Sequence, residues 1–217
     1  MTRIATLALA VSLTLAACSI GSSPNIVGSG HAATDQRAVE SFTKVRVNSA
    51  IAATVIVGSD ISVTVTADDN ILPQVTTNVT AGRLDVSLQS SLNIKTPVSV
   101  AITMPSIESV EATSAATVTV TGVNGDSLSA SATSAGSIVA RGDANSIDVS
   151  ADSAGQADLG GVPAQDATAR VGSGARATVN AQISVSGSVD AGGVLRVEGS
   201  PAQVNVTTQT GGVVVRD

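Results

Sequence analysis

Serine is the residue whose repeated placement in this chain most invites a chemical interpretation. It opens a tripeptide of small residues at Ser114, Ser134, Ser153 and Ser173. A serine nucleophile has such small neighbours when it lies on a sharp strand-to-helix turn and has a histidine as its base. The chain has a single histidine, His31, far from these serines in the sequence, and no helical pattern follows them. We therefore predict that the serines are structural and that the protein is not an enzyme.

The tripeptides recur with a nearly fixed period. Later copies begin at Ala191 and Thr210, and successive copies are separated by 18 to 20 residues. A fixed period in this range is typical of solenoids, in which each repeat packs only on its neighbours. The tripeptide residues that we predict to be structural turn positions are Ser114, Ser134, Gly136, Ser153, Gly155, Ser173, Gly174, Gly192 and Gly211.

The residues around each tripeptide alternate between apolar and polar side chains. Val118 and Val120 follow the first copy with Thr119 between them, and the later copies keep this spacing. A spacing of two indicates strands with one buried face and excludes a helical repeat, which would need a spacing of about 3.6. The sequence therefore predicts an all-β fold: a β-helix-like solenoid with coils of about 19 residues, each made of a strand, a tight turn, a strand and a looser turn.

The segment 35–112 is also rich in strand signals, but it is less regular. We predict strands at 42–47, 52–57, 61–66, 83–88, 98–104 and 107–112, with one short helical turn within 68–75. We interpret this segment as an irregular cap that covers the first open edge of the solenoid, with the single aromatic residue, Phe42, inside it. The repeat solenoid itself is predicted to occupy 113–217.

Residues 1–17 have the features of an export signal. Arg3 precedes a short apolar run that is too short to span a bilayer. The run ends in Leu15-Ala16-Ala17-Cys18, which resembles the signal of bacterial lipoproteins. This resemblance implies cleavage before Cys18 and attachment of lipid to its sulfur and amine. The alternative is an ordinary secretory signal with an accidental cysteine, but Cys18 is the only cysteine, so it has no internal disulfide partner.

The segment 18–34 is predicted to be the lipidated cysteine and a flexible tether. Serine, glycine, proline and alanine dominate it, and no apolar period is visible. Ser19 after the cysteine implies, within the lipoprotein pattern, transfer to the outer membrane if the cell has two membranes. We therefore expect an exported, membrane-anchored protein that lies on the periplasmic face or the cell surface.

Composition limits the possible partners. The formal net charge is −6 and the chain has no Trp or Tyr, so neither an electrostatic footprint for nucleic acid nor stacking platforms are present. The aspartates of the repeats lack the spacing of calcium-binding β-rolls. We predict no metal site and no cofactor. The partners that remain are the membrane, through the N-terminal lipid, and an unknown protein or polymer.

One known family shares this organisation. An export signal with a cysteine, a β region that ends in Val98-Ser99-Val100-Ala101-Ile102-Thr103-Met104-Pro105, and serial Ser-Ala-Gly turns resemble the putative auto-transporter adhesin head GIN domain. The resemblance covers roughly residues 40–215. It implies a right-handed β-helix-like solenoid and supplies no catalytic residues.

Three functions are compatible with these observations. The first is a lipid-anchored, non-catalytic solenoid of the cell envelope that binds a protein or polymer in an adhesion-type or structural role. The second is a polysaccharide-acting β-helix enzyme, which is favoured by analogy of fold alone. The third is a periplasmic component of an envelope-sensing system. The anchor and the absence of a catalytic pattern favour the first.

Overall fold

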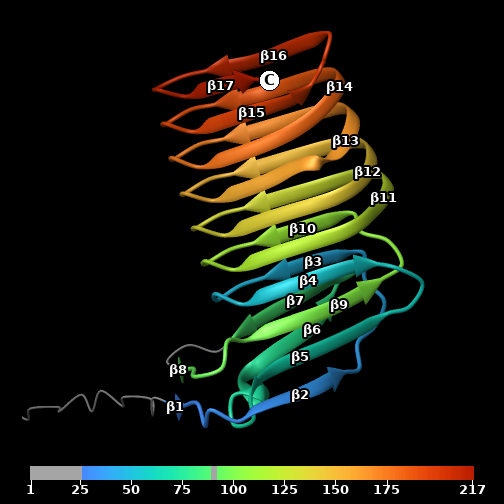
Figure 1. Ribbon diagram of the computed structural model, residues 1–217, viewed down its shortest axis with the longest axis vertical. Coiled ribbons are helices and arrows are strands. Elements are labelled where there is room, and N and C mark those ends of the chain that lie inside the picture. The colour runs from blue at the N-terminus through green and yellow to red at the C-terminus, as the bar shows by residue number, and fades with distance from the viewer. Residues whose placement is uncertain (1–25, 89–91) are drawn as a thin grey trace, which may run out of the picture.

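The computed structural model describes residues 26–88 and 92–217, and this part of the chain is almost entirely β-structure. Its coils lie one above another along the long axis of the molecule (Figure 1). The main path of hydrogen-bonded strands through the large sheet has the order β17-β15-β14-β13-β12-β11-β10-β3-β7-β6. The solenoid predicted from the repeats is therefore confirmed.

The regular part of the stack begins with β10 (Ser109–Ala112) and continues through four long strands and three short ones. These strands are β11 (Thr117–Ala132), β12 (Ser137–Ala151), β13 (Gln156–Val171), β14 (Arg176–Val189), β15 (Val194–Gly199), β16 (Gln203–Thr208) and β17 (Val213–Arg216). Neighbouring coils pair in parallel, and the register places Val118 beside Ile138, which is the spacing read from the sequence. The predicted coil length of about 19 residues is confirmed.

The looser turn predicted in each regular coil is wrong in its detail. Each of the four long strands bends in the middle and stays paired, so one strand serves both faces of the stack. Where β11 and β12 bend, their pairing shifts register between Thr121 and Val123. Gly122 and Gly142, at this shift, have φ of 80° and 138°. Glycine supplies the positive φ that an irregularity of this kind needs, so the chain turns without leaving the ladder.

The first two coils of the solenoid lie inside the segment that we interpreted as a cap. One consists of β3 (Lys44–Val47) and β4 (Ala52–Val57), which pair with β10 and β11. The other consists of β7 (Arg83–Leu88) and β9 (Ser99–Met104), which pair with β3 and β4 from the other side. The boundary predicted at 112/113 is therefore wrong as a fold boundary. The chain leaves the stack after β4 and returns below it, and this break hides the period.

The cap is smaller than predicted and consists of antiparallel strands. β5 (Ser62–Asp68) pairs with β9 and with β2 (Ala32–Arg37), and β6 (Val75–Thr80) pairs with β7. The short 3-10 helix η1 (Leu72–Gln74) connects β5 to β6 and confirms the helical turn predicted there. These elements cover the lower edges of β7 and β9, as a stack of strands requires at its end.

A last pair of short strands lies at the same end of the molecule. β1 (Ile26–Val27) pairs in parallel with β8 (Leu92–Asn93), and both lie at the lower left in Figure 1. Residues 26–34, predicted to be flexible tether, are thus part of the fold in β1, β2 and the turn between them. Strands of two residues carry no detectable period, so the sequence could not reveal them.

The core is a continuous column of small and medium apolar side chains. One row runs through Val118, Ile138, Ala157, Ala177 and Leu195, all of which are at most 2% exposed. Small side chains such as alanine bury little surface, so stacked ladders and closely packed valines supply the stability that a thick core supplies elsewhere. The side chains of this row fill the space between the two faces of each coil.

Candidate binding surfaces

The tripeptides form the tight-turn edge of the molecule, and their first two residues have left-handed backbone conformations. In the second copy, φ is 51° at Ser134 and 61° at Ala135. The N–H of Gly136 donates to the carbonyl of Thr133 at 2.9 Å and closes a four-residue turn. Two positive φ values in such a turn define type I′, which favours glycine and small residues.

The predicted turn residues fall into three positions with different demands. Ser114, Ser134, Ser153 and Ser173 take the first position, and Gly174, Gly192 and Gly211 take the second, all with positive φ. Gly136 and Gly155 take the third, where a Cβ on Gly136 would lie 2.2 Å from the carbonyl oxygen of Ala112. Small residues are therefore selected by backbone conformation at the first two positions and by close approach to the coil below at the third.

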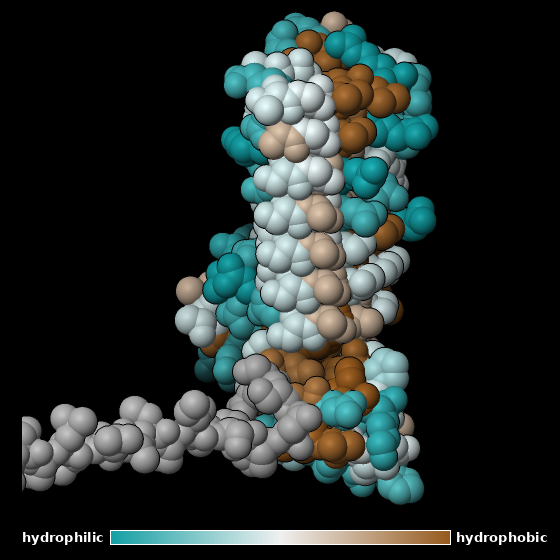
Figure 2. Space-filling model, turned by 90° about the vertical axis from the view of Figure 1, so that its left-hand side faces the viewer, coloured by the Kyte–Doolittle hydropathy of each residue, from teal (hydrophilic) through white to brown (hydrophobic). Residues whose placement is uncertain are grey.

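Hydrogen bonds join each tight turn to the next one. The N–H of Ala115 donates to the carbonyl of Ser134, and the N–H of Ala135 donates to the carbonyl of Ser153, each at 3.0 Å. The result is a smooth ridge of nearly neutral hydropathy that runs up the molecule (Figure 2). His31 lies between β1 and β2, so no histidine is placed to activate these serines. Backbone hydrogen bonds between successive turns therefore build this ridge.

The opposite edge, where the long strands bend, holds a shallow polar groove of about 450 Å³. Amide and carboxylate side chains line it, including Asn124, Asp126, Asn145 and Gln182. Asn145 Nδ2 donates to Asp126 Oδ1 at 3.1 Å, so part of this hydrogen-bonding capacity is used within the groove. Among residues 26–88 and 92–217, no three His, Cys, Asp or Glu side chains come together as metal ligands would. The lining side chains of the groove offer hydrogen-bond donors and acceptors to a ligand.

A second surface is defined by β10, β16 and the second halves of β11 to β14, and we call it the hydroxyl face. Its outward side chains form columns that cross the coils in register, and the two columns that also include residues of β10 are the longest. One column is Ser109, Ser129, Asp148, Thr168, Ser186 and Asn205, and the other is Glu111, Ser131, Ser150, Arg170, Ser188 and Thr207. Neighbouring coils lie about 4.8 Å apart, so the face is a regular array of hydroxyl groups with few charges.

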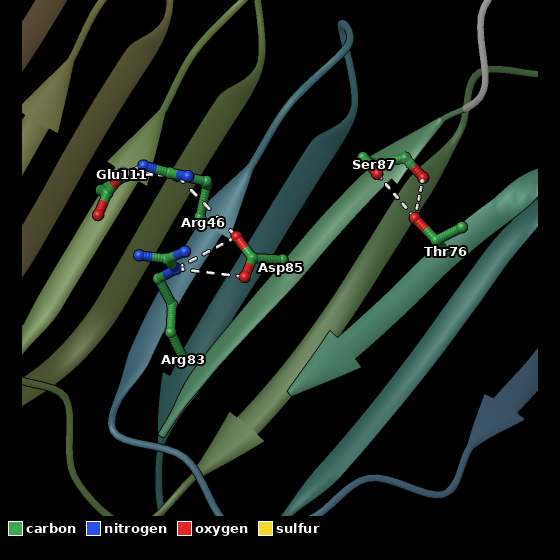
Figure 3. Close-up of polar contacts among 6 residues, drawn as sticks. All are labelled: Arg46, Thr76, Arg83, Asp85, Ser87 and Glu111. Carbon is green, nitrogen blue, oxygen red and sulfur yellow. Dashed lines mark hydrogen bonds and ion pairs between the residues drawn. The ribbon is translucent and has the colours of Figure 1, made fainter. Parts of the chain in front are cut away.

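At the lower end of the hydroxyl face, ion pairs join strands that are far apart in the sequence (Figure 3). Arg46 of β3 contacts Glu111 of β10 at 2.6 Å and Asp85 of β7 at 3.9 Å. Arg83 contacts the same Asp85 at 3.2 Å, and Thr76 of β6 bonds to Ser87 of β7 at 2.7 Å. These contacts lie where the coil formed by β3 and β4 sits between coils from other parts of the chain. Their arrangement favours that order of stacking, since a different order would separate the charges.

A buried carboxylate holds the N-terminal segment onto the body of the molecule. Asp68, at the end of β5, is fully buried. Its Oδ1 accepts hydrogen bonds from the N–H of Gly30 at 2.9 Å and the hydroxyl of Thr96 at 2.8 Å. Its Oδ2 accepts from the N–H groups of Lys95 and Thr96 at 2.9 and 3.1 Å. We call Asp68 and these partners the anchor clasp, because they bind the segments that follow β1 and β8 to the end of β5.

The clasp keeps Asp68 ionised. Burial by itself raises the pKa of this carboxyl group, but the hydrogen bonds from Lys95, Thr96 and Gly30 lower it to about 2. Gly28 completes the fit, since a Cβ there would lie 2.0 Å from Asp68 Oδ2. Our sequence analysis missed Asp68. A carboxylate beside other polar residues carries no sequence signal of its burial, and its donors are mostly backbone groups.

The predicted lipidation residue, Cys18, lies outside the described residues. The described chain begins at Ile26, whose strand β1 is fixed by the clasp. Among the described residues, no helix is long and apolar enough to cross a membrane.

Several solved structures share this architecture. A putative adhesin from Bacteroides fragilis matches with a TM-score of 0.71 and 18% identity, over 88% of this chain and 100% of that chain. A putative adhesin from Parabacteroides merdae matches with a TM-score of 0.61 and 15% identity, over 88% and 98% of the two chains. A putative lipid binding protein from Parabacteroides distasonis matches with a TM-score of 0.56 and 16% identity, over 88% and 99%. At these identities the matches establish a shared fold. No curated protein matches the chain.

The sequence itself identifies the family. The model of the putative auto-transporter adhesin, head GIN domain, matches residues 41–201. This range contains both out-of-order coils and the regular coils up to β15, so it covers most of the described fold. It agrees with the resemblance seen in the Met-Pro step and the serial Ser-Ala-Gly turns. The chain belongs to the putative auto-transporter adhesin, head GIN domain family.

Proposed function

We propose that the protein is a lipid-anchored, non-catalytic binding module of the cell envelope that holds an extended polar polymer on its hydroxyl face. The family and the solenoid fold support an adhesion-type module. The sequence ending in Cys18 supports attachment through lipid. The hydroxyl face supplies the place where a ligand would lie.

The regular register of the hydroxyl face is the observation that carries this proposal. Ser131 lies beside Ser150, Ser150 lies beside Arg170, and Arg170 lies beside Ser188 in successive coils. A flat array of this kind presents hydrogen-bonding groups at equal steps, which suits a ligand that is itself extended and repetitive. A small molecule would need a concave site in which most of its surface is buried. We therefore favour a polymer over a metabolite.

The side chains on this face suit binding rather than bond cleavage. Serine and threonine hydroxyls both donate and accept hydrogen bonds, and they remain neutral at physiological pH. The ion pair between Arg170 and Asp148, at 3.3 Å, leaves little net charge at its centre. Binding through such a face would depend on many weak contacts and would be only weakly sensitive to salt.

A matched pair of arginine substitutions tests the face. Ser131 and Thr119 both lie on β11 and are both half-buried, but they point to opposite faces of the coil. Binding of the unlipidated protein to isolated envelope polysaccharides and to whole cells would be measured by co-sedimentation. We expect Ser131→Arg to weaken binding about ten-fold and Thr119→Arg to leave it nearly unchanged, because only the first places a bulky cation in the array. Equal loss in both variants, or no binding by the parent protein, would refute the proposed surface.

Attachment is tested separately. We expect Cys18→Ser to move the protein from the membrane fraction to the soluble fraction of lysed cells. Protease treatment of intact cells that carry a C-terminal tag then reports which way the solenoid faces. Loss of the tag would support a role at the cell surface, whereas survival until the outer membrane is opened would favour a periplasmic partner. Membrane association that persists in Cys18→Ser would contradict lipid anchoring.

A further inference from the structure

The anchor clasp shortens the segment that could act as a flexible tether between Cys18 and the folded domain. Our sequence analysis allowed a flexible segment up to residue 34, but β1 begins at Ile26 and is fixed to the body. The chain from Cys18 to Ile26 spans eight residues. Fully extended, such a segment reaches at most about 28 Å. If Cys18 carries the lipid, the end of the molecule that holds β1 stays within this distance of the bilayer.

Exposed apolar side chains lie at that same end. Val27, in β1, is 50% exposed, and Ile94, one residue after β8, is 37% exposed. β1 and β8 are paired, with Val27 opposite Asn93, so the two apolar residues belong to one small structural unit. Figure 2 shows hydrophobic surface at this end of the stack, below the ridge of tight turns. The exposed apolar surface of these two side chains is unfavourable in water. Burial of that surface at a lipid interface would lower the free energy.

A cation accompanies these side chains. Lys95 follows Ile94, is exposed, and carries its side chain over Gly30, where a Cβ would lie 3.5 Å from its Cδ. A lysine beside apolar residues can bury its stem and keep its ammonium group among lipid phosphates. One exposed acidic group, Asp69, lies close by, and its Oδ1 accepts a hydrogen bond from Ser29. Asp69 and the buried, ionised Asp68 give this end two negative charges against the one positive charge of Lys95, so the apolar side chains must supply most of the attraction, and Lys95 is the group that meets lipid phosphates.

We propose that the β1–β8 end of the solenoid docks on the membrane surface, with Val27, Ile94 and Lys95 in the headgroup region. This inference rests on the proposed lipid anchor. A short tether raises the effective concentration of bilayer at this surface, so two or three weakly interacting side chains are enough to orient the domain. Because the clasp fixes the segments after β1 and β8 to β5, the whole stack would take a fixed orientation when this end contacts the membrane. The coils from β11 to β17 then project from the membrane and carry the hydroxyl face outward.

The absence of tryptophan from the sequence makes this contact directly measurable. A single tryptophan introduced by Val27→Trp reports lipid contact through quenching by brominated acyl chains. Ile183→Trp is the matched control, since Ile183 is 49% exposed and lies on β14, several coils away. The lipidated full-length protein would be reconstituted in vesicles of phosphatidylethanolamine and phosphatidylglycerol, and flotation would verify attachment. Ile94→Trp supplies a second reporter in case Val27→Trp disturbs β1.

We expect brominated lipid to quench the tryptophan at position 27 or 94 about two-fold and to leave that at position 183 unquenched. Vesicles that float with the protein but quench none of the three, or quench all three equally, would overturn the docking and leave the lipid anchor intact. Protein that fails to float with the vesicles would overturn both the anchor and the docking that depends on it.

Discussion

Two adjacent residues of one tight turn should respond in opposite ways to exchanges between glycine and alanine. Ala154 occupies the second position of its turn with φ of 61°, and Gly155 occupies the third. The left-handed conformation costs a residue with a Cβ about 1–2 kcal/mol, whereas glycine adopts it freely but loses about 0.5–1 kcal/mol more entropy on folding. Ala154→Gly should therefore stabilise the protein by up to about 1.5 kcal/mol.

The reverse exchange at the next residue should destabilise the protein. A Cβ on Gly155 would lie 2.0 Å from the carbonyl oxygen of Ala132 and 2.6 Å from its carbon. The coil below cannot yield without moving its backbone, and strain of this kind costs about 1–3 kcal/mol. The cost should not exceed this range, because Ala116 and Ala175 hold the same position in other coils, so the turn can open slightly. We expect Gly155→Ala to lose about 1–3 kcal/mol of stability.

Thermal unfolding of the unlipidated Cys18→Ser protein, followed by far-ultraviolet circular dichroism, measures both effects. For a chain of this size, 1 kcal/mol corresponds to a shift in Tm of about 2–4 °C, so the two variants should separate clearly. Ser131→Ala, at a regular strand position of the hydroxyl face, is the control and should stay within about 0.5 kcal/mol of the parent. A lower Tm for Ala154→Gly, or an unchanged Tm for Gly155→Ala, would refute the assignment of backbone conformation to these turns.

Three further predictions concern the clasp, the ion pairs and the core. Because the pKa of Asp68 is lowered to about 2, the contribution of the ionised carboxylate to stability should be complete above pH 3.8 and lost as the pH falls toward 2. Amide hydrogen exchange of residues 92–96 should accelerate in that window, and unchanged protection would contradict the hydrogen bonds of the clasp. A double-mutant cycle of Arg46→Ala and Glu111→Ala, read by urea unfolding, should give a coupling of about 0.3–1 kcal/mol, since both groups are partly exposed; a coupling of zero would argue against their role in stacking order. Leu159→Ala should cost about 2–5 kcal/mol in the same assay, because Leu159 is fully buried between coils, and a loss below 1 kcal/mol would show that the core is loosely packed.

The regular coils were predictable because every layer there follows the previous one in sequence. A register that pairs Val118 with Ile138, and Ile138 with Ala157, is visible as a period in the chain. The same turn occurs earlier at Ser49 and Ala50, with φ of 64° and 55°. The sequence analysis did not find this turn, because Val45 of the same coil pairs with Val110. These two residues are far apart in the sequence, so the coil does not follow the period of the later ones.

The binding surfaces were less predictable than the coils. The hydroxyl face follows from the alternation once the register is known, because serine and threonine occupy the outward positions on each side of buried residues such as Ala130 and Val149. The anchor clasp did not follow, since Asp68 binds mainly backbone N–H groups, and any residue except proline can supply those. A site built on backbone donors is fixed by tertiary structure and not by side-chain pattern.

The order of the coils gives the two ends of the molecule different physical characters. From β12 to β17, each coil depends on contacts with the coil about 19 residues before it, so this part can form by successive local additions. The coil of β3 and β4 cannot form in this way, since its neighbours are β7 and β9 on one side and β10 and β11 on the other. The end that holds β1, β2 and β8 must therefore close as one long-range unit. This is also the end of the described structure that lies nearest Cys18 in the sequence. The coils that depend on long-range pairing thus lie at the N-terminal end of the stack, and the coils that repeat locally carry most of the hydroxyl face.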